Sequence, residues 1–181
     1  MSDVKGGLGS FAKKSIAAGV AGAIVFVLAQ EIAGYPQNIA EFMGNQLTSR
    51  GPLPESMSLV FGWAIHVTIA IGYAALFGAA VASPMLRSPA GGVRFIPAVV
   101  LALVLGYVAG VIAPPAISAT LGLLTGEGLP AALPLLNLSF GFAIWNHIGF
   151  FIVCLLVLVI IPASRAGSRR GGSAASSEAD G

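Results

Sequence analysis

Charged residues are scarce in this chain and cysteine is almost absent. Asp, Glu, Lys and Arg make up 9% of the 181 residues, and the mean hydropathy of +0.91 lies far above that of a soluble domain. The single Cys excludes an internal disulfide and any CxxC metal or redox motif. A net charge of +2, spread thinly over the ends of apolar segments, is not the pattern of a nucleic-acid surface. The composition therefore predicts a protein embedded in a lipid bilayer, with no nucleic-acid partner.

Long hydrophobic runs are abundant instead. Four of them reach the roughly 20 residues needed to cross a hydrocarbon core, and they cover residues 16–35, 59–82, 95–119 and 138–161. Backbone in lipid must bond within its own segment or in a closed barrel, and runs of this length exclude strands. The sequence thus predicts an all-α fold with four transmembrane helices in an antiparallel bundle (16–161), between an N-terminal segment (1–15) and a disordered tail (162–181). Pro114 and Pro115, with the short extension of Ala, Ile and Ser that follows them to residue 119, are expected to mark the end of the third helix.

The basic residues predict how these helices are oriented, because short cytoplasmic loops retain Lys and Arg. The segments before the first span, between the second and third, and after the fourth lie on one side of the membrane. They contain Lys5, Lys13, Lys14, Arg87, Arg94, Arg165, Arg169 and Arg170, whereas the segments on the other side contain only Arg50. Both termini are therefore predicted to be cytoplasmic, in a multi-pass protein of a bacterial inner membrane. The apolar run after Lys14 also fits a signal peptide, but it continues to full membrane length, which favours a retained helix.

Two connections are then expected on the outer side. In residues 36–58, Ile39, Phe42, Met43 and Leu47 recur at helical spacing, which indicates either a short helix along the interface or a loop with helical bias. The second connection, residues 120–137, is rich in Gly and Pro and is predicted to be a compact irregular loop. Residues 61–66 also resemble residues 140–147, which indicates either two repeated helical hairpins or chance similarity between apolar segments.

Ionisable side chains inside the four runs are the best indication of a site. Apart from Cys and Tyr, they are Glu31, His66 and His147. With 1.5 Å of rise per residue, the two His lie roughly 10–15 Å below the outer boundary and Glu31 lies roughly 6–8 Å below it. Gln30 and Asn146 are neighbouring hydrogen-bonding groups. These five residues are predicted to form one polar cluster in the outer leaflet.

Three roles for this polar cluster stay open. The first is structural, with Glu31 reaching toward the headgroups and each His joining two helices by a hydrogen bond. The second is ligation of haem b, with His66 and His147 as axial ligands from two helices of a bundle. The third is a proton-coupled or small-solute carrier that uses Glu31. Two His and one Glu also suit zinc, but no HxxxH or HExxH spacing supports a metal site.

Small residues in the third run indicate close helix packing. Gly106 and Gly110 form a GxxxG pair, which serves either packing within the monomer or assembly with itself or another membrane subunit. The sequence holds no Walker loop, no GxSxG and no HExxH motif, so no catalytic residues are predicted. The predicted function is a small accessory or scaffold subunit that packs against other membrane helices. A haem-binding electron-transfer protein and a carrier are the alternatives.

Several short motifs follow one another along residues 16–161 in a characteristic order. They are Gly19-Val20-Ala21-Gly22, Gly34-Tyr35-Pro36, His66 followed by Gly72-Tyr73, Pro84, Pro114-Pro115 and His147. This order resembles that of the uncharacterised YagU-like inner-membrane proteins of bacteria. The resemblance implies four helices in an inner membrane and a role for the His66 position, and it brings no established activity. The chain departs from that group in its long fourth run, which lacks a basic end close to His147.

Overall fold

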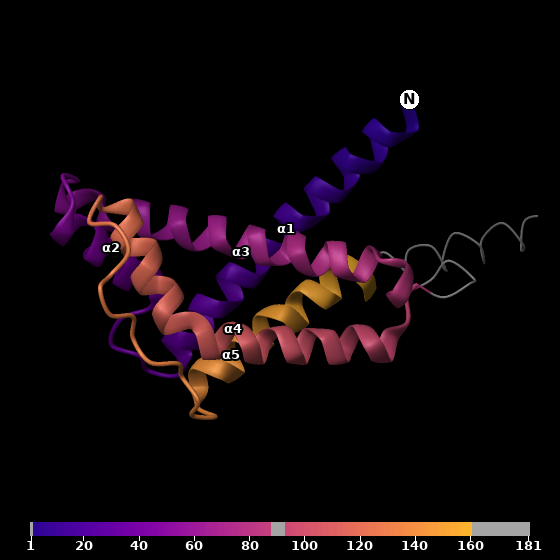
Figure 1. Ribbon diagram of the computed structural model, residues 1–181. Helices are drawn as coiled ribbons and strands as arrows, with labels where there is room; N and C mark the ends of the chain where they lie inside the picture. The colour runs from indigo at the N-terminus through magenta and orange to yellow at the C-terminus, as the bar shows by residue number, and fades with distance from the viewer. Residues whose placement is uncertain (1, 88–92, 161–181) are drawn as a thin grey trace, which may run out of the picture.

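Five α-helices make up most of the computed structural model, which describes residues 2–87 and 93–160, with side chains from residue 9 onward (Figure 1). They are α1 (Ser2–Ile32), α2 (Ile39–Arg50), α3 (Ser58–Ala82), α4 (Phe95–Leu124) and α5 (Phe142–Leu155). Short 3₁₀ turns, η1 (Glu55–Met57) and η2 (Pro84–Leu86), precede and follow α3, and a π-helical turn, η3 (Leu156–Ile160), extends α5. The predicted tail over 162–181 lies outside the described residues.

Four of these helices are long and apolar enough to cross a membrane. The candidate spans are Gly9–Ile32, Glu55–Ala82, Phe95–Leu124 and Phe142–Ile160. The described residues form no strand, only an isolated bridge between Arg87 and Val93. The predicted all-α, four-span fold is therefore confirmed. The predicted orientation of the termini stays a prediction.

Helix ends differ from the predicted ranges where local turn chemistry intervenes. α1 already begins at Ser2, so the segment predicted to precede it is helical from that residue on. It ends at Ile32, because Gly34 takes a φ of +73° that ends the helical path. α5 begins at Phe142, later than predicted, because the backbone between residues 137 and 141 bonds to α4 and to itself.

The connection over residues 36–58 contains α2, so the helix is the correct alternative there. The side chain of Asn38 caps its first turn, with Oδ1 accepting from the backbone N–H of Glu41 at 3.0 Å. One face of α2 is buried against α3: Ala40, Met43, Gly44, Leu47 and Thr48. The backbones approach closely there, since a Cβ on Gly44 would collide with the carbonyl oxygen of Ser58. α2 is thus part of the packed bundle.

α4 continues past its two prolines to Leu124, five residues beyond the predicted end at residue 119. Neither Pro114 nor Pro115 can donate a backbone hydrogen bond, which frees the carbonyl oxygens four residues earlier. Asn137 N–H donates to one of them, Val111 O, at 2.9 Å. The helix bends sharply and its second part runs across the end of the bundle (Figure 1). The part before the bend is about 28 Å long, enough to span a hydrocarbon core.

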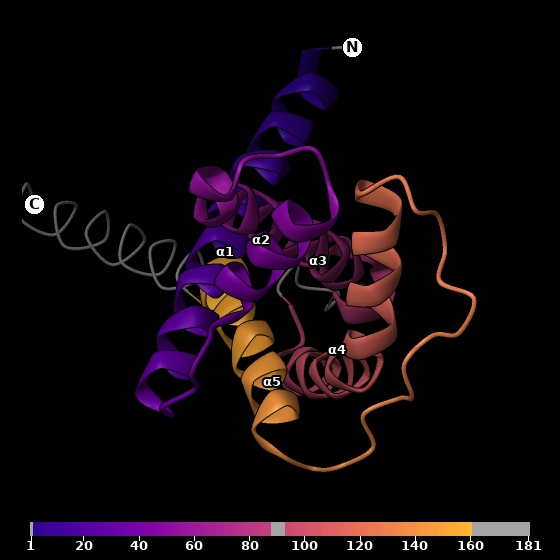
Figure 2. The same cartoon turned by 90° about the vertical axis from the view of Figure 1, so that its left-hand side faces the viewer.

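The order of packing places α1 and α5 at the centre. α1 packs on α3 and on α5, α5 packs on α4, and α2 covers the beginning of α3 (Figures 1 and 2). α3 and α4 pack little on each other. The main core cluster includes Ala18, Phe26, Phe77, Phe150 and Cys154, all at most 7% exposed.

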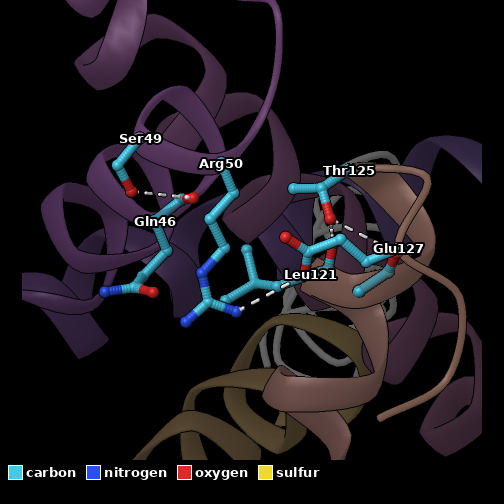
Figure 3. Close-up of polar contacts among 7 residues, drawn as sticks. Gln46, Ser49, Arg50, Leu121, Thr125 and Glu127 are labelled. Carbon is cyan, nitrogen blue, oxygen red and sulfur yellow. Dashed lines mark hydrogen bonds and ion pairs between the residues drawn. The ribbon is translucent and has the colours of Figure 1, made fainter.

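One end of the bundle, called the capped end below, carries α2, residues 51–57, the second part of α4 and residues 125–141 (Figures 1 and 2). Figure 3 shows polar contacts at this end, where Arg50 of α2 lies 3.9 Å from the carboxylate of Glu127. Both side chains are about half exposed (45% and 53%), so the pair contributes about 0–1 kcal/mol. The hydroxyl of Thr125 donates to Leu121 O at 3.0 Å and finishes α4. The N-terminus of α1 lies at the opposite end (Figure 1).

Candidate functional site

The structure divides the predicted polar cluster into two groups. The first group, Gln30, Glu31 and Asn38, joins the last turn of α1 to the first turn of α2. Glu31 Oε1 accepts from Asn38 Nδ2 at 2.7 Å, and Gln30 Oε1 accepts from the backbone N–H of Ile39 at 2.9 Å. Glu31 is exposed, because α1 ends at the next residue. This group fixes the path between the two helices.

The second group lies in the bundle, where α3 and α5 each donate a hydrogen bond to α1. His66 Nε2 lies 3.3 Å from Ala23 O, and Asn146 Nδ2 donates to Phe26 O at 3.0 Å. A carbonyl oxygen can only accept, so the proton of His66 is on Nε2. Both side chains are buried, at 9% and 6% exposure. In lipid such bonds join helices, which matches the structural role among the three considered.

His147 belongs to this group by position but bonds within its own helix. Its Nδ1 donates to Ala143 O at 2.7 Å, four residues earlier. The ring of Phe26 contacts both imidazoles, with centroids 5.5 Å from His66 and 4.9 Å from His147. Trp63 adds a contact to His66 at 6.0 Å. The two His thus share an aromatic environment centred on Phe26.

This packing bears on whether haem fits. Axial ligation requires two ring nitrogens that face the iron across an open space. His66 Nε2 is occupied by Ala23 O, and the Phe26 ring fills the region next to both imidazoles. The described arrangement does not fit a haem held by both residues, and haem binding stays a prediction that this packing disfavours.

The remaining site predictions can be compared with the same geometry. Among the described residues, no group of three His, Cys, Asp or Glu side chains could hold a metal ion. Glu31, on which the carrier prediction depends, lies in the last turn of α1, with its carboxylate bonded to Asn38. The carrier also stays a prediction.

The GxxxG pair serves packing inside the monomer. A Cβ on Gly106 would lie 2.5 Å from Ile148 Cα, and one on Gly110 would lie 2.9 Å from Ile144 Cα, so α4 and α5 cross at backbone contact. α1 and α3 cross in the same way, since a Cβ on Gly19 would lie 2.5 Å from Ile71 Cα. The two hairpins therefore share a crossing geometry. The register differs from the predicted repeat, because aligning Ile71 with Ile148 places His66 on Ala143 rather than on His147.

A different set of small residues lies on the surface of α3. Ala64, Thr68, Gly72 and Ala79 are exposed and fall on one face, at spacings of four, four and seven residues. Two large exposed side chains lie on the same face: Val60, four residues before Ala64, and Leu76, four residues after Gly72. The four small residues together are called the α3 small-residue face below. The small residues Gly72 and Ala79 can be seen in the sequence, but which face of α3 is left exposed can be known only from the structure.

The chain matches no family model, no curated protein and no solved structure. The resemblance to YagU-like proteins therefore stays a prediction, and the geometry alone must support a function.

Proposed function

We propose that this protein is an accessory or scaffold subunit of a bacterial inner membrane, and that its α3 small-residue face packs against a transmembrane helix of a partner. Interfaces between membrane helices are rich in small residues, because these let two backbones approach closely. Within residues 2–87 and 93–160, no helix covers this face: Ala64, Thr68, Gly72 and Ala79 are all exposed.

The exposed faces of α1 and α4 are richer in large side chains than the α3 small-residue face, where Val60 and Leu76 are the large ones beside four small residues, and this contrast carries the proposal. Large aliphatic side chains occupy the surfaces of α1 and α4: Ile16, Ile24, Val25, Leu28, Ile96, Val100, Leu103, Val104 and Val108 are each at least 42% exposed. These are the side chains expected to face lipid chains. An exposed face on which Ala, Thr and Gly outnumber the large side chains favours contact with another helix.

Gly72 supports the same conclusion. A Cβ at this position would have no atom within 4 Å, whereas one on Gly19 or Gly106 would meet the backbone of a neighbouring helix. Gly in the middle of a helix lowers helix stability relative to Ala, by about 1 kcal/mol in water. A Cβ at Gly149 of α5 would be equally open, so Gly72 supports the partner contact only together with the other residues of the α3 small-residue face.

The proposed orientation has the capped end outside. Lys13, Lys14, Arg87 and Arg94 are exposed toward the opposite end, while Arg50 is the one basic residue of the capped end among those described. Glu41, Glu55 and Glu127 also lie at the capped end. This distribution supports cytoplasmic termini by the positive-inside rule.

Gly72→Leu and Gly149→Leu form a matched pair for the test. Both glycines lie inside spanning helices with no neighbour within 4 Å, but Gly149 lies on α5 near the large, exposed Trp145. Tagged protein is purified from native membranes in mild detergent. A partner is expected to co-purify with wild type and with Gly149→Leu and to be lost from Gly72→Leu, with unchanged helicity by circular dichroism. Recovery of a monodisperse monomer in all three cases, or equal recovery of the partner, would contradict the proposal.

A further inference from the structure

The connection between α4 and α5 exposes many large apolar side chains on irregular backbone. Six of them are more than half exposed: Leu129, Leu133, Leu135, Leu136, Leu138 and Phe140. The sequence has no charged residue between Glu127 and Arg165. A connection in water would leave this apolar surface unpaired, which soluble proteins avoid. These side chains therefore require an apolar environment.

The backbone of the same connection requires a polar environment. Among the described residues, Asn137 is the only one between 129 and 140 whose backbone N–H donates to a carbonyl, that of Val111 at 2.9 Å. The other N–H groups need water or lipid headgroups, because irregular backbone exposed to lipid is not stable in the hydrocarbon core. Only the boundary between headgroups and acyl chains satisfies both requirements.

The aromatic residues beside this connection also indicate the boundary. Phe140 stacks on Tyr107 of α4 with ring centroids 5.5 Å apart, and its ring meets Trp145 of α5 edge to face, also at 5.5 Å. Tyr107 and Trp145 are 37% and 57% exposed. Exposed Tyr and Trp are typical of the membrane–water interface. Figure 2 shows the connection running along the outer side of the second part of α4, away from the other helices.

We infer that residues 129–140 form an interfacial anchor, whose leucines insert into the lipid leaflet at the capped end while its backbone stays hydrated. The partner is a lipid surface, because one end of the anchor continues into the spanning helix α5 and the other joins the second part of α4 at the capped end, which together hold it at the boundary. Its lack of charge predicts insertion by apolar contact, with no requirement for anionic headgroups. The anchor needs no partner protein and is independent of the α3 small-residue face.

Spin labelling in vesicles of phosphatidylcholine tests this anchor. A label is attached to Leu135→Cys in a Cys154→Ala background, and its accessibility to oxygen, which partitions into lipid, is compared with that to a water-soluble nickel chelate. Val104→Cys on the exposed face of α4 and Glu55→Cys in the connection before α3 give the lipid and water references. The oxygen-to-nickel ratio at Leu135 is expected to exceed that at Glu55 and to fall below that at Val104.

Two results would overturn the inference. A ratio at Leu135 equal to that at Glu55 would place the anchor in water. A label that neither reagent reaches would show that protein covers the segment, such as a second copy of the chain. Leu138→Cys provides the same comparison if Leu135→Cys does not fold, because both leucines are exposed in the same connection.

Discussion

The crossing of α4 and α5 at Gly106 gives the sharpest stability prediction, because Gly106→Ala adds a Cβ 2.5 Å from Ile148 Cα. Carbon atoms in contact normally lie about 3.5–4.0 Å apart, so the two helices must separate by about 1 Å. Such overpacking lowers the free energy of unfolding by about 1–3 kcal/mol. The change also removes a helix-destabilising glycine, which acts in the opposite direction.

Gly72→Ala is the matched control, since its Cβ has no atom within 4 Å and the gain in helix propensity is the same. Unfolding of both variants is followed by far-ultraviolet circular dichroism during SDS titration of mixed micelles. Gly106→Ala is expected to unfold with a free energy about 1–3 kcal/mol below that of Gly72→Ala. Equal free energies would refute the backbone contact between α4 and α5.

Three further predictions concern hydrogen bonds and haem. Asn146→Leu removes the bond to Phe26 O and is expected to lower the free energy of unfolding by about 1 kcal/mol in the same SDS titration, whereas no change would exclude that bond. Pro115→Ala restores a donor for Val111 O and is expected to reduce the bend of α4, measured by electron-paramagnetic distances between labels on its two parts. An unchanged distance would show that Pro115 does not cause the bend. Purified protein that is incubated with haemin and then separated from free haemin is expected to show no Soret band, because His66 Nε2 is occupied by Ala23 O, and a retained band that His66→Ala removes would contradict this.

The four spans and α2 could be predicted from the sequence, because both depend on local patterns. A run of about 20 apolar residues has no stable state in lipid other than a helix. α2 follows from apolar residues at helical spacing after a capping Asn38. Phe42 belongs to the apolar residues that predicted this helix, yet its side chain is exposed. The spacing of apolar residues therefore predicts that α2 is a helix better than it predicts which side chains of α2 are buried.

The continuation of α4 through its bend could not be predicted, because the hydrogen bond that satisfies the freed carbonyl comes from a residue outside the helix. Pro115 normally ends a helix, and here the carbonyl it leaves without a donor is satisfied by Asn137, far along the chain. No sequence pattern around the two prolines predicts that hydrogen bond.

The prediction of the polar cluster was only partly correct, again because the deciding contacts lie between distant residues. Counting residues gives the depth of a side chain in the membrane, but not its direction around the helix axis. His66 and Asn146 both turn toward α1, whereas His147 bonds within α5. Glu31 lies in the last turn of α1, since α1 ends at the next residue. Depth alone therefore placed in one cluster side chains that the structure divides between two.

Photo-crosslinking in native membranes tests the proposed partner contact most directly. A photoreactive amino acid replaces Gly72 on the α3 small-residue face or Val104 on the aliphatic face of α4. Crosslinks to a second polypeptide are expected from position 72 and not from position 104. Crosslinks from neither position, or equally from both, would contradict the assignment of α3 as the helix that meets a partner.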